Sequence, residues 1–169
     1  VVNERRRDHV NIYQNENFIV AIDTYYDRRN SFLFQTNPLG ALRDGYITDE
    51  RVHNVDWSTA WNVRSSRDET GWSFEMAIPF KSLRFTGGAN QNWGLQVRRS
   101  IRRKNEWAYL TPVPQSMAGP MALNRVSVYG TATGIDAPPA GRTFEIKPYV
   151  VGRTTTDRLR NPPISNDPD

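Results

Sequence analysis

Few residues of this sequence are equipped for acid–base or nucleophilic chemistry. There is no cysteine, which excludes thiol nucleophiles, disulfides and cysteine-bound metals. The two histidines, His9 and His53, stand in polar segments outside any nucleophile or metal motif, so both are expected to be solvated. Glu75 and a loop aspartate could form the carboxylate pair of a glycoside hydrolase, but a bond from Glu75 to Arg98 across a sheet is the expected arrangement. The sequence therefore favours a protein that is not an enzyme.

Aromatic side chains offer a different chemistry, because their flat rings can support a ligand. Proteins that bind sugars use such rings as platforms and place amide, carboxylate or guanidinium groups beside them to bond hydroxyls. Trp57 and Trp107 are expected at the ends of loops or strands beside such groups, which makes them candidate platforms. Tyr109, Asn105 and Arg99 complete the candidate carbohydrate site. Packing of the two tryptophans at the rim of a sheet is the alternative interpretation.

Metals, cofactors and nucleic acid are not expected as ligands. The oxygen-rich segment at residues 44–50 lacks the spacing of a calcium-binding loop, and the Gly87-Gly88 pair is a turn signal rather than a phosphate loop. The net charge of +4 comes from basic residues interleaved with acids, which favours solvated strand faces over a nucleic-acid interface. The apolar runs are far shorter than the roughly 18 residues of a membrane-spanning helix, so no such helix is expected.

The elements that must hold these side chains are β-strands. Apolar residues recur at every second position, and no segment keeps a helical period. Turn residues separate short strands, which are expected at residues 18–22, 31–35, 42–48, 59–66, 72–78, 93–101, 106–110 and 125–130. Many short antiparallel strands joined by turns indicate a sandwich or a barrel. We therefore predict an all-β fold, an antiparallel β-sandwich that is either complete or lacks part of its strands.

The same pattern predicts which side chains form the core and where the sandwich ends. Trp61, Trp72 and Trp93 are expected in the core. The polar side chains of the strand at 93–101 are expected to face solvent, among them Arg98. The sandwich is expected over residues 1–134, a Pro/Gly linker over 135–143, and a stub of a second β region with an extended tail over 144–169.

Several motifs, in one order along the chain, resemble a bacterial protein family. They are IDTYYDRR at 22–29, FQTNPLG at 34–40, RDGY at 43–46, IPF at 78–80, LRF at 83–85 and WGLQV at 93–97, together with the tryptophan segments at 56–61 and 71–75. Proteins of this family carry a carbohydrate-binding-module family 9-like domain ahead of a long β-rich region that looks like an outer-membrane barrel. The resemblance covers roughly residues 1–134.

The resemblance implies a non-catalytic binding or accessory module of the bacterial envelope, periplasmic or associated with the outer membrane. Family members have early strands that this chain lacks, and a missing strand leaves an unpaired sheet edge. The expected partner is therefore a carbohydrate or another envelope protein that covers this edge. The alternative function is that of a structural subunit docked on the periplasmic side of a larger membrane complex. A glycoside hydrolase is the remote alternative.

Overall fold

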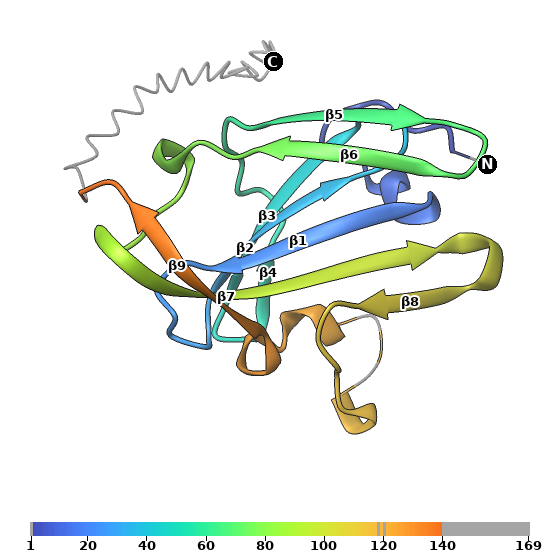
Figure 1. Ribbon diagram of the computed structural model, residues 1–169. Helices are drawn as coiled ribbons and strands as arrows, with labels where there is room; N and C mark the ends of the chain where they lie inside the picture. The colour runs from blue at the N-terminus through green and yellow to red at the C-terminus, as the bar shows by residue number, and fades with distance from the viewer. Residues whose placement is uncertain (1, 118, 120, 140–169) are drawn as a thin grey trace, which may run out of the picture.

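The computed structural model describes residues 2–117, 119 and 121–139, and these residues form an all-β fold (Figure 1). Its strands are β1 (Asn17–Asp23), β2 (Ser31–Thr36), β3 (Leu42–Thr48), β4 (Val52–Asn54), β5 (Asn62–Arg67), β6 (Trp72–Ala77), β7 (Gly88–Ile101), β8 (Glu106–Tyr109) and β9 (Gly130–Ala137). Short 3-10 helices connect them: η1 (Val10–Gln14), η2 (Phe80–Ser82), η3 (Arg102–Lys104), η4 (Gln115–Met117), η5 (Ala122–Asn124) and η6 (Val126–Val128). The predicted fold class is confirmed, and among these residues no helix is long and apolar enough to cross a membrane.

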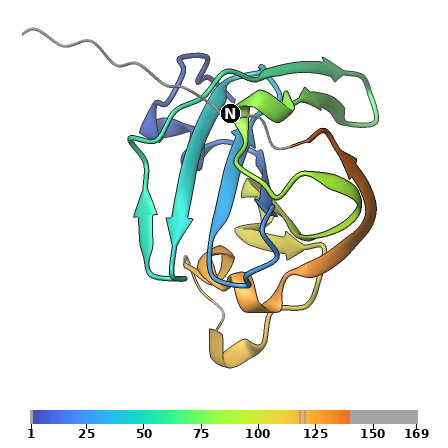
Figure 2. The same cartoon turned by 90° about the vertical axis from the view of Figure 1, so that its left-hand side faces the viewer.

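Most of the strands form one antiparallel sheet, which we call the main sheet. Its order is β4-β3-β2-β1-β7-β8, and β9 pairs with β7 beside β8. The long strand β7 thus borders β1 on one side and both β8 and β9 on the other. The register between β7 and β9 shifts between Gly88 and Gln91 and again between Gln91 and Trp93, and such bulges increase the local bend of a strand. The sheet is strongly curled as a result (Figure 2).

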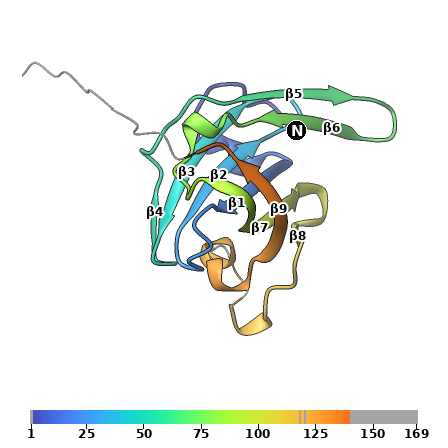
Figure 3. The same ribbon diagram turned by 60° about the vertical axis from the view of Figure 1, so that its left-hand side comes forward.

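A separate hairpin of β5 and β6 covers one face of the main sheet, which we call the hairpin face. Phe32, Phe34 and Trp93 project from the sheet to this side, where Trp61 and Leu83 pack against them. Phe34 is completely buried, and its ring meets that of Trp61 edge-on at 5.3 Å between centroids. The curl of the sheet brings β9 towards this hairpin, as Figure 3 shows. The expected core positions of Trp61 and Trp93 are confirmed, while Trp72 is only half-buried beside Phe18.

The opposite side of the main sheet, which we call the pocket face, is also covered. Ile19, Leu33 and Ile47 project to this side and pack against Leu123 and Val126 from the 3-10 segment that precedes β9. Both faces of the central strands are therefore buried, and every residue of β2 is buried.

Two expectations for the strands need correction on this face. The strand predicted at 125–130 is wrong, because these residues form the 3-10 helix η6 and only then enter β9. The prediction that Arg98 faces solvent is also wrong, since it is 6% exposed, and its neighbours Gln96 and Ser100 are buried as well. Gln96 is covered by Thr111, to which it donates hydrogen bonds, and Arg98 and Ser100 line a pocket together with Leu123 and Asn124 of the 3-10 segment.

We next compare the predicted strand positions and region limits with the observed strands. The seven strands expected at 18–22, 31–35, 42–48, 59–66, 72–78, 93–101 and 106–110 are confirmed as β1, β2, β3, β5, β6, β7 and β8, with shifted ends for β5 and β7. Strand β4 lies between the strands expected at 42–48 and 59–66, where no strand was expected. Strand β9 continues through Ala137, beyond the boundary expected at residue 134. The stub and tail expected at 144–169 lie outside the described residues.

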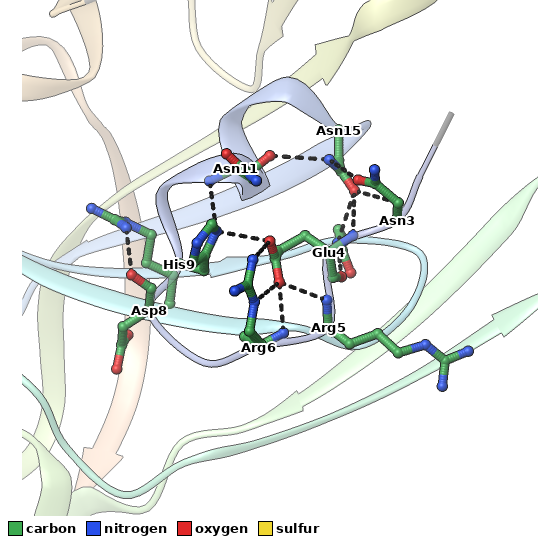
Figure 4. Close-up of polar contacts among 10 residues, drawn as sticks. Asn3, Glu4, Arg5, Arg6, Asp8, His9, Asn11 and Asn15 are labelled. Carbon is green, nitrogen blue, oxygen red and sulfur yellow. Dashed lines mark hydrogen bonds and ion pairs between the residues drawn. The ribbon is translucent and has the colours of Figure 1, made fainter.

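A polar cluster fastens the N-terminal segment to the rest of the fold (Figure 4). The carboxylate of Glu4 accepts hydrogen bonds from the backbone and side chain of Arg6 and lies 2.8 Å from Nδ1 of His9. The amide of Asn37, in the turn between β2 and β3, donates to the carbonyl of Glu4 and to the side chain of Asn15. Residues on both sides of η1 are thereby fixed to the β2–β3 turn at one end of the main sheet.

Candidate functional site

A pocket of about 360 Å³ opens on the pocket face of the main sheet. This volume is near the lower end of the ~300–1,000 Å³ range of small-molecule sites. Ile19 of β1, Leu33 of β2 and Ser100 of β7 line it from three adjacent strands. Because neighbouring strands are in register here, alternate side chains of each strand point to the same side and form a continuous floor. The floor is apolar in the middle of the sheet and becomes polar towards β7.

The wall at the β8 side is formed by a tryptophan and an arginine. Trp107 lies opposite Ser100 in the β7–β8 register, so its ring projects to the pocket face. The side chain remains 40% exposed although it lines the pocket. The guanidinium of Arg98 lies 5.5 Å from the centre of this ring, which is within the range of a cation–π interaction. The ring is thus held in place from one side and accessible to a ligand.

A second aromatic ring, that of Tyr13, lines the pocket from the 3-10 helix η1. The guanidinium of Arg43 is 4.9 Å from the centre of this ring and also donates a hydrogen bond to the carbonyl of Asp8. The helix itself is held by Asn15 and Asn17, whose side chains bond to its backbone carbonyls. Tyr13 therefore has a defined position even though it belongs to a short helix.

His53 of β4 lines the pocket and lies directly over Gly45 of β3. A Cβ atom at residue 45 would be only 2.9 Å from Nε2 of His53, so the imidazole occupies space that a glycine leaves open. Burial lowers the pKa of His53 below its ordinary value, and the positive charges of Arg43 and Arg98 lower it further. The histidine is consequently a neutral donor and acceptor at physiological pH.

The remaining wall comes from the segment of η5, which contributes Met121, Leu123 and Asn124. The hydroxyl of Tyr129 donates to the carbonyl of Leu123, and the tyrosine is buried at 4% exposure. Burial strongly raises the pKa of Tyr129, so this hydroxyl keeps its proton and its bond. Asn124, itself 5% exposed, is thus presented by a segment tied to the core.

Of the five candidate residues from the sequence, Trp107 lines this pocket. Tyr109 projects to the same face one step further along β8, where it packs against the core cluster, and its hydroxyl has no hydrogen-bond partner among the described residues. Asn105 occupies the left-handed position (φ 52°) of the turn between η3 and β8. Asparagine tolerates this conformation, so Asn105 allows the chain to turn before it enters β8 at Glu106 and Trp107.

Trp57 and Arg99 lie on the other side of the main sheet. The ring of Trp57 packs against Phe32 at 5.1 Å, within the core of the hairpin face. Arg99 is exposed on β7, 4.0 Å from Glu16 and stacked near Phe18. The structure therefore does not bring the five candidates together in one site.

The sequence reasoning missed Tyr13, His53, Arg98 and Asn124 as pocket residues. Arg98 was expected in solvent because a strand with one polar face usually turns that face to water, and His53 because it stands in a polar segment. The sequence does contain one signal for Arg98. The strand β7 is polar on one side but pairs with β1, which is apolar on both faces, so β7 is a central strand and its polar side chains must also be covered. Tyr13 and Asn124 belong to irregular segments that carry no periodic pattern.

The expected partner of Glu75 is not the one that the structure gives it. Glu75 is exposed on β6 opposite Arg64, in a hairpin that does not include β7, so the predicted bond from Glu75 to Arg98 is wrong. In the part of the chain that the structure describes, no three His, Cys, Asp or Glu side chains gather closely enough to hold a metal ion.

The fold and the pocket define an all-β protein with an aromatic and cationic pocket on one face of its main sheet. No protein-family model, no curated protein and no solved structure matches this chain. The resemblance to the carbohydrate-binding-module family 9-like domains therefore stays a prediction from sequence motifs.

Proposed function

We propose that this chain is a non-catalytic binding module of the bacterial envelope and that its ligand is a carbohydrate, held in the pocket beside Trp107. The observation that carries the proposal is the lining of this pocket. It combines an accessible indole and a phenol ring with Arg98, Ser100 and Asn124, all three of which are polar and mostly buried.

Such a lining suits a sugar because a sugar ring has two kinds of surface. The C–H groups on its faces pack against aromatic rings, while its hydroxyls need both donors and acceptors. Trp107 and Tyr13 supply the rings, and Ser100 and Asn124 supply groups that donate and accept. The family resemblance in the sequence predicts the same class of ligand.

Rigidity of the pocket also supports this function. Its walls are tied to the core by the Tyr129–Leu123 hydrogen bond and by the side chains of Asn15 and Asn17. A preformed site avoids the entropic cost of ordering side chains on binding, which matters for the small contact area of one or two sugar rings.

The substitution Trp107→Ala tests the proposal. We expect it to weaken binding about tenfold or more, because a central aromatic anchor dominates the energy of a small site. The measurement is a glycan array followed by calorimetric titration of each hit. Tyr25→Ala is the matched control, since Tyr25 is 49% exposed and does not line the pocket. Equal affinity of Trp107→Ala and the unmodified protein for every hit would overturn the proposed site.

A second candidate function is that of a structural subunit docked on the periplasmic side of a membrane complex. The observation in its favour is the edge at β8, which pairs only with β7 among the described residues and is followed by Leu110 at 58% exposure. Stoichiometric recovery with an identified membrane protein, lost on Leu110→Asp, together with an empty glycan array, would support this function over the first.

A further inference from the structure

Among the described residues that line the pocket, the charged groups are all cations. Arg98 lies against Trp107 with 6% of its surface exposed, and Arg102 of η3 lines the mouth with its side chain exposed to solvent. Arg43, behind Tyr13, adds to the positive potential and, with Arg98, acts on the pKa of His53. Among the described residues that line the pocket there is no aspartate and no glutamate.

The acidic side chains near this region are engaged elsewhere. Glu16 accepts the backbone N–H of Arg102 and approaches Arg99. Glu106 precedes Trp107 in β8, so it projects to the other face of the strand. Glu50 accepts the backbone N–H of Ser127 in η6. None of these carboxylates lines the pocket.

Without a carboxylate, the acceptors of this lining are the side-chain oxygens of Ser100 and Asn124 and the imidazole of His53. Each hydroxyl of a neutral sugar brings a proton that needs an acceptor, and carboxylates are the strongest acceptors available to a protein. An arginine has donors only, arranged as a planar fork that matches the two oxygens of a carboxylate or sulfate. The mostly buried position of Arg98 strengthens this preference, because charge attraction grows as water is excluded.

We infer that the pocket takes an acidic sugar, carboxylated or sulfated, whose ring lies against Trp107 and whose anionic group meets the guanidinium groups of Arg98 and Arg102. This inference rests on the proposed function and adds the class of sugar to it. Trp107 supplies the platform common to all sugars, and the two arginines supply the selection for an anion.

The test compares three disaccharides that differ only in their terminal unit, which is glucose, glucuronate or glucose 6-sulfate. Calorimetric titration of the full chain is expected to give at least about tenfold tighter binding for an acidic disaccharide than for the neutral one, the size of effect that a charge-assisted hydrogen bond produces. The stronger of the two acidic ligands identifies the anionic group. The advantage over the neutral ligand should shrink as salt is added, because ions screen the arginine at the mouth.

Matched variants separate a specific contact from general attraction by a basic protein. Arg102→Gln removes a lining charge, whereas Arg103→Gln removes the same charge from the next residue of η3, which does not line the pocket. We expect a loss of about tenfold in affinity for the acidic ligand from the first and almost none from the second. Arg98→Lys keeps the buried charge without the planar fork, and it should weaken acidic binding while a circular dichroism spectrum shows the fold intact.

Each outcome bears on one of the two claims. Equal or tighter binding of the neutral disaccharide, lost in Trp107→Ala, would overturn the acidic-sugar inference and leave the carbohydrate function standing. The same would follow from equal losses in Arg102→Gln and Arg103→Gln. No binding of any carbohydrate on the array or by calorimetry would overturn the carbohydrate function and this inference with it.

Discussion

At the scale of single residues, the pocket depends on a glycine as much as on its charged side chains. Gly45 leaves room above β3 for the ring of His53, and a Cβ atom there would come within 2.9 Å of Nε2. A contact of that length requires one of the two groups to move. His53 can lie at the pocket because Gly45 has no Cβ atom. No sequence motif around His53 indicates this.

We predict that Gly45→Ala displaces His53 and raises its pKa towards the ordinary value. Burial is the main cause of the lowered pKa, so a ring pushed towards solvent loses most of this effect. An NMR titration of the imidazole resonances measures the change. Gly71→Ala is the control, because a Cβ atom at residue 71 has no neighbour within 4 Å. An unchanged titration of His53 in Gly45→Ala would show that the backbone, rather than the ring, yields to the added methyl group.

At the scale of elements, the segment before η1 is fixed by hydrogen bonds, whereas η1 itself also buries the side chain of Ile12. Glu4 holds the backbone and side chain of Arg6, and Asn15 accepts the backbone N–H groups of Asn3 and Glu4. The hydrogen bonds from Arg6 stabilise the ionised form of Glu4 and are the main cause that lowers its pKa from 4.5 to about 2. The position of Tyr13 at the pocket is therefore linked to the charge of a residue outside it.

This linkage predicts how the segment responds to acid. The pKa of Glu4 is lower in the folded chain than in the unfolded chain, so its stabilisation is complete above pH 4.5 and is lost as the pH falls towards about 2. Glu4→Gln should therefore lower the melting temperature at pH 7 and flatten its dependence on pH across this window. Thermal melts of both proteins from pH 7 to acid provide the measurement. Glu69→Gln, which alters an exposed carboxyl in the β5–β6 turn, is the control. Parallel melting curves for Glu4→Gln and the unmodified protein would contradict the linkage.

The elements also show how far the sequence alone leads. Period-two alternation predicted most strands, because an apolar residue at every second position can be buried only by a sheet, as in β6. The alternation gave a wrong prediction for Arg98. It indicates which residues share a face of the sheet, but not whether a segment without regular strands covers that face. The covering segment, with Leu123 and Val126, is a run of 3-10 turns without a period, and its contacts are determined by tertiary packing. The same limit explains why only Trp107 of the five candidates lies in the pocket.

At the scale of the whole molecule, the main sheet separates two hydrophobic clusters, one on the hairpin face and one on the pocket face. On the hairpin face, Phe32, Phe34 and Trp61 form an aromatic core, whereas the pocket face carries both the apolar cluster around Ile19 and Leu33 and the candidate pocket. Adjacent residues of β2 serve opposite sides, since Leu33 lines the pocket and Phe34 is buried beneath the hairpin. The stability of the fold and the affinity of the pocket can therefore be changed separately.

We accordingly predict that Phe34→Ala destabilises the protein without weakening the pocket. Its ring is completely buried, and replacing such a ring by alanine costs about 3–5 kcal/mol through lost burial and the cavity left behind. Urea denaturation measures this cost, and calorimetric titration with the ligand found for the unmodified chain measures affinity at a temperature where the variant remains folded. We expect affinity within about twofold of the unmodified protein, which corresponds to less than about 0.5 kcal/mol.

Trp107→Ala should show the reverse, a large loss of affinity with little change in stability, because its side chain is 40% exposed. If Phe34→Ala lost as much affinity as Trp107→Ala while still folded, the two faces of the sheet would be coupled, and the pocket could no longer be described as a site built on one face alone.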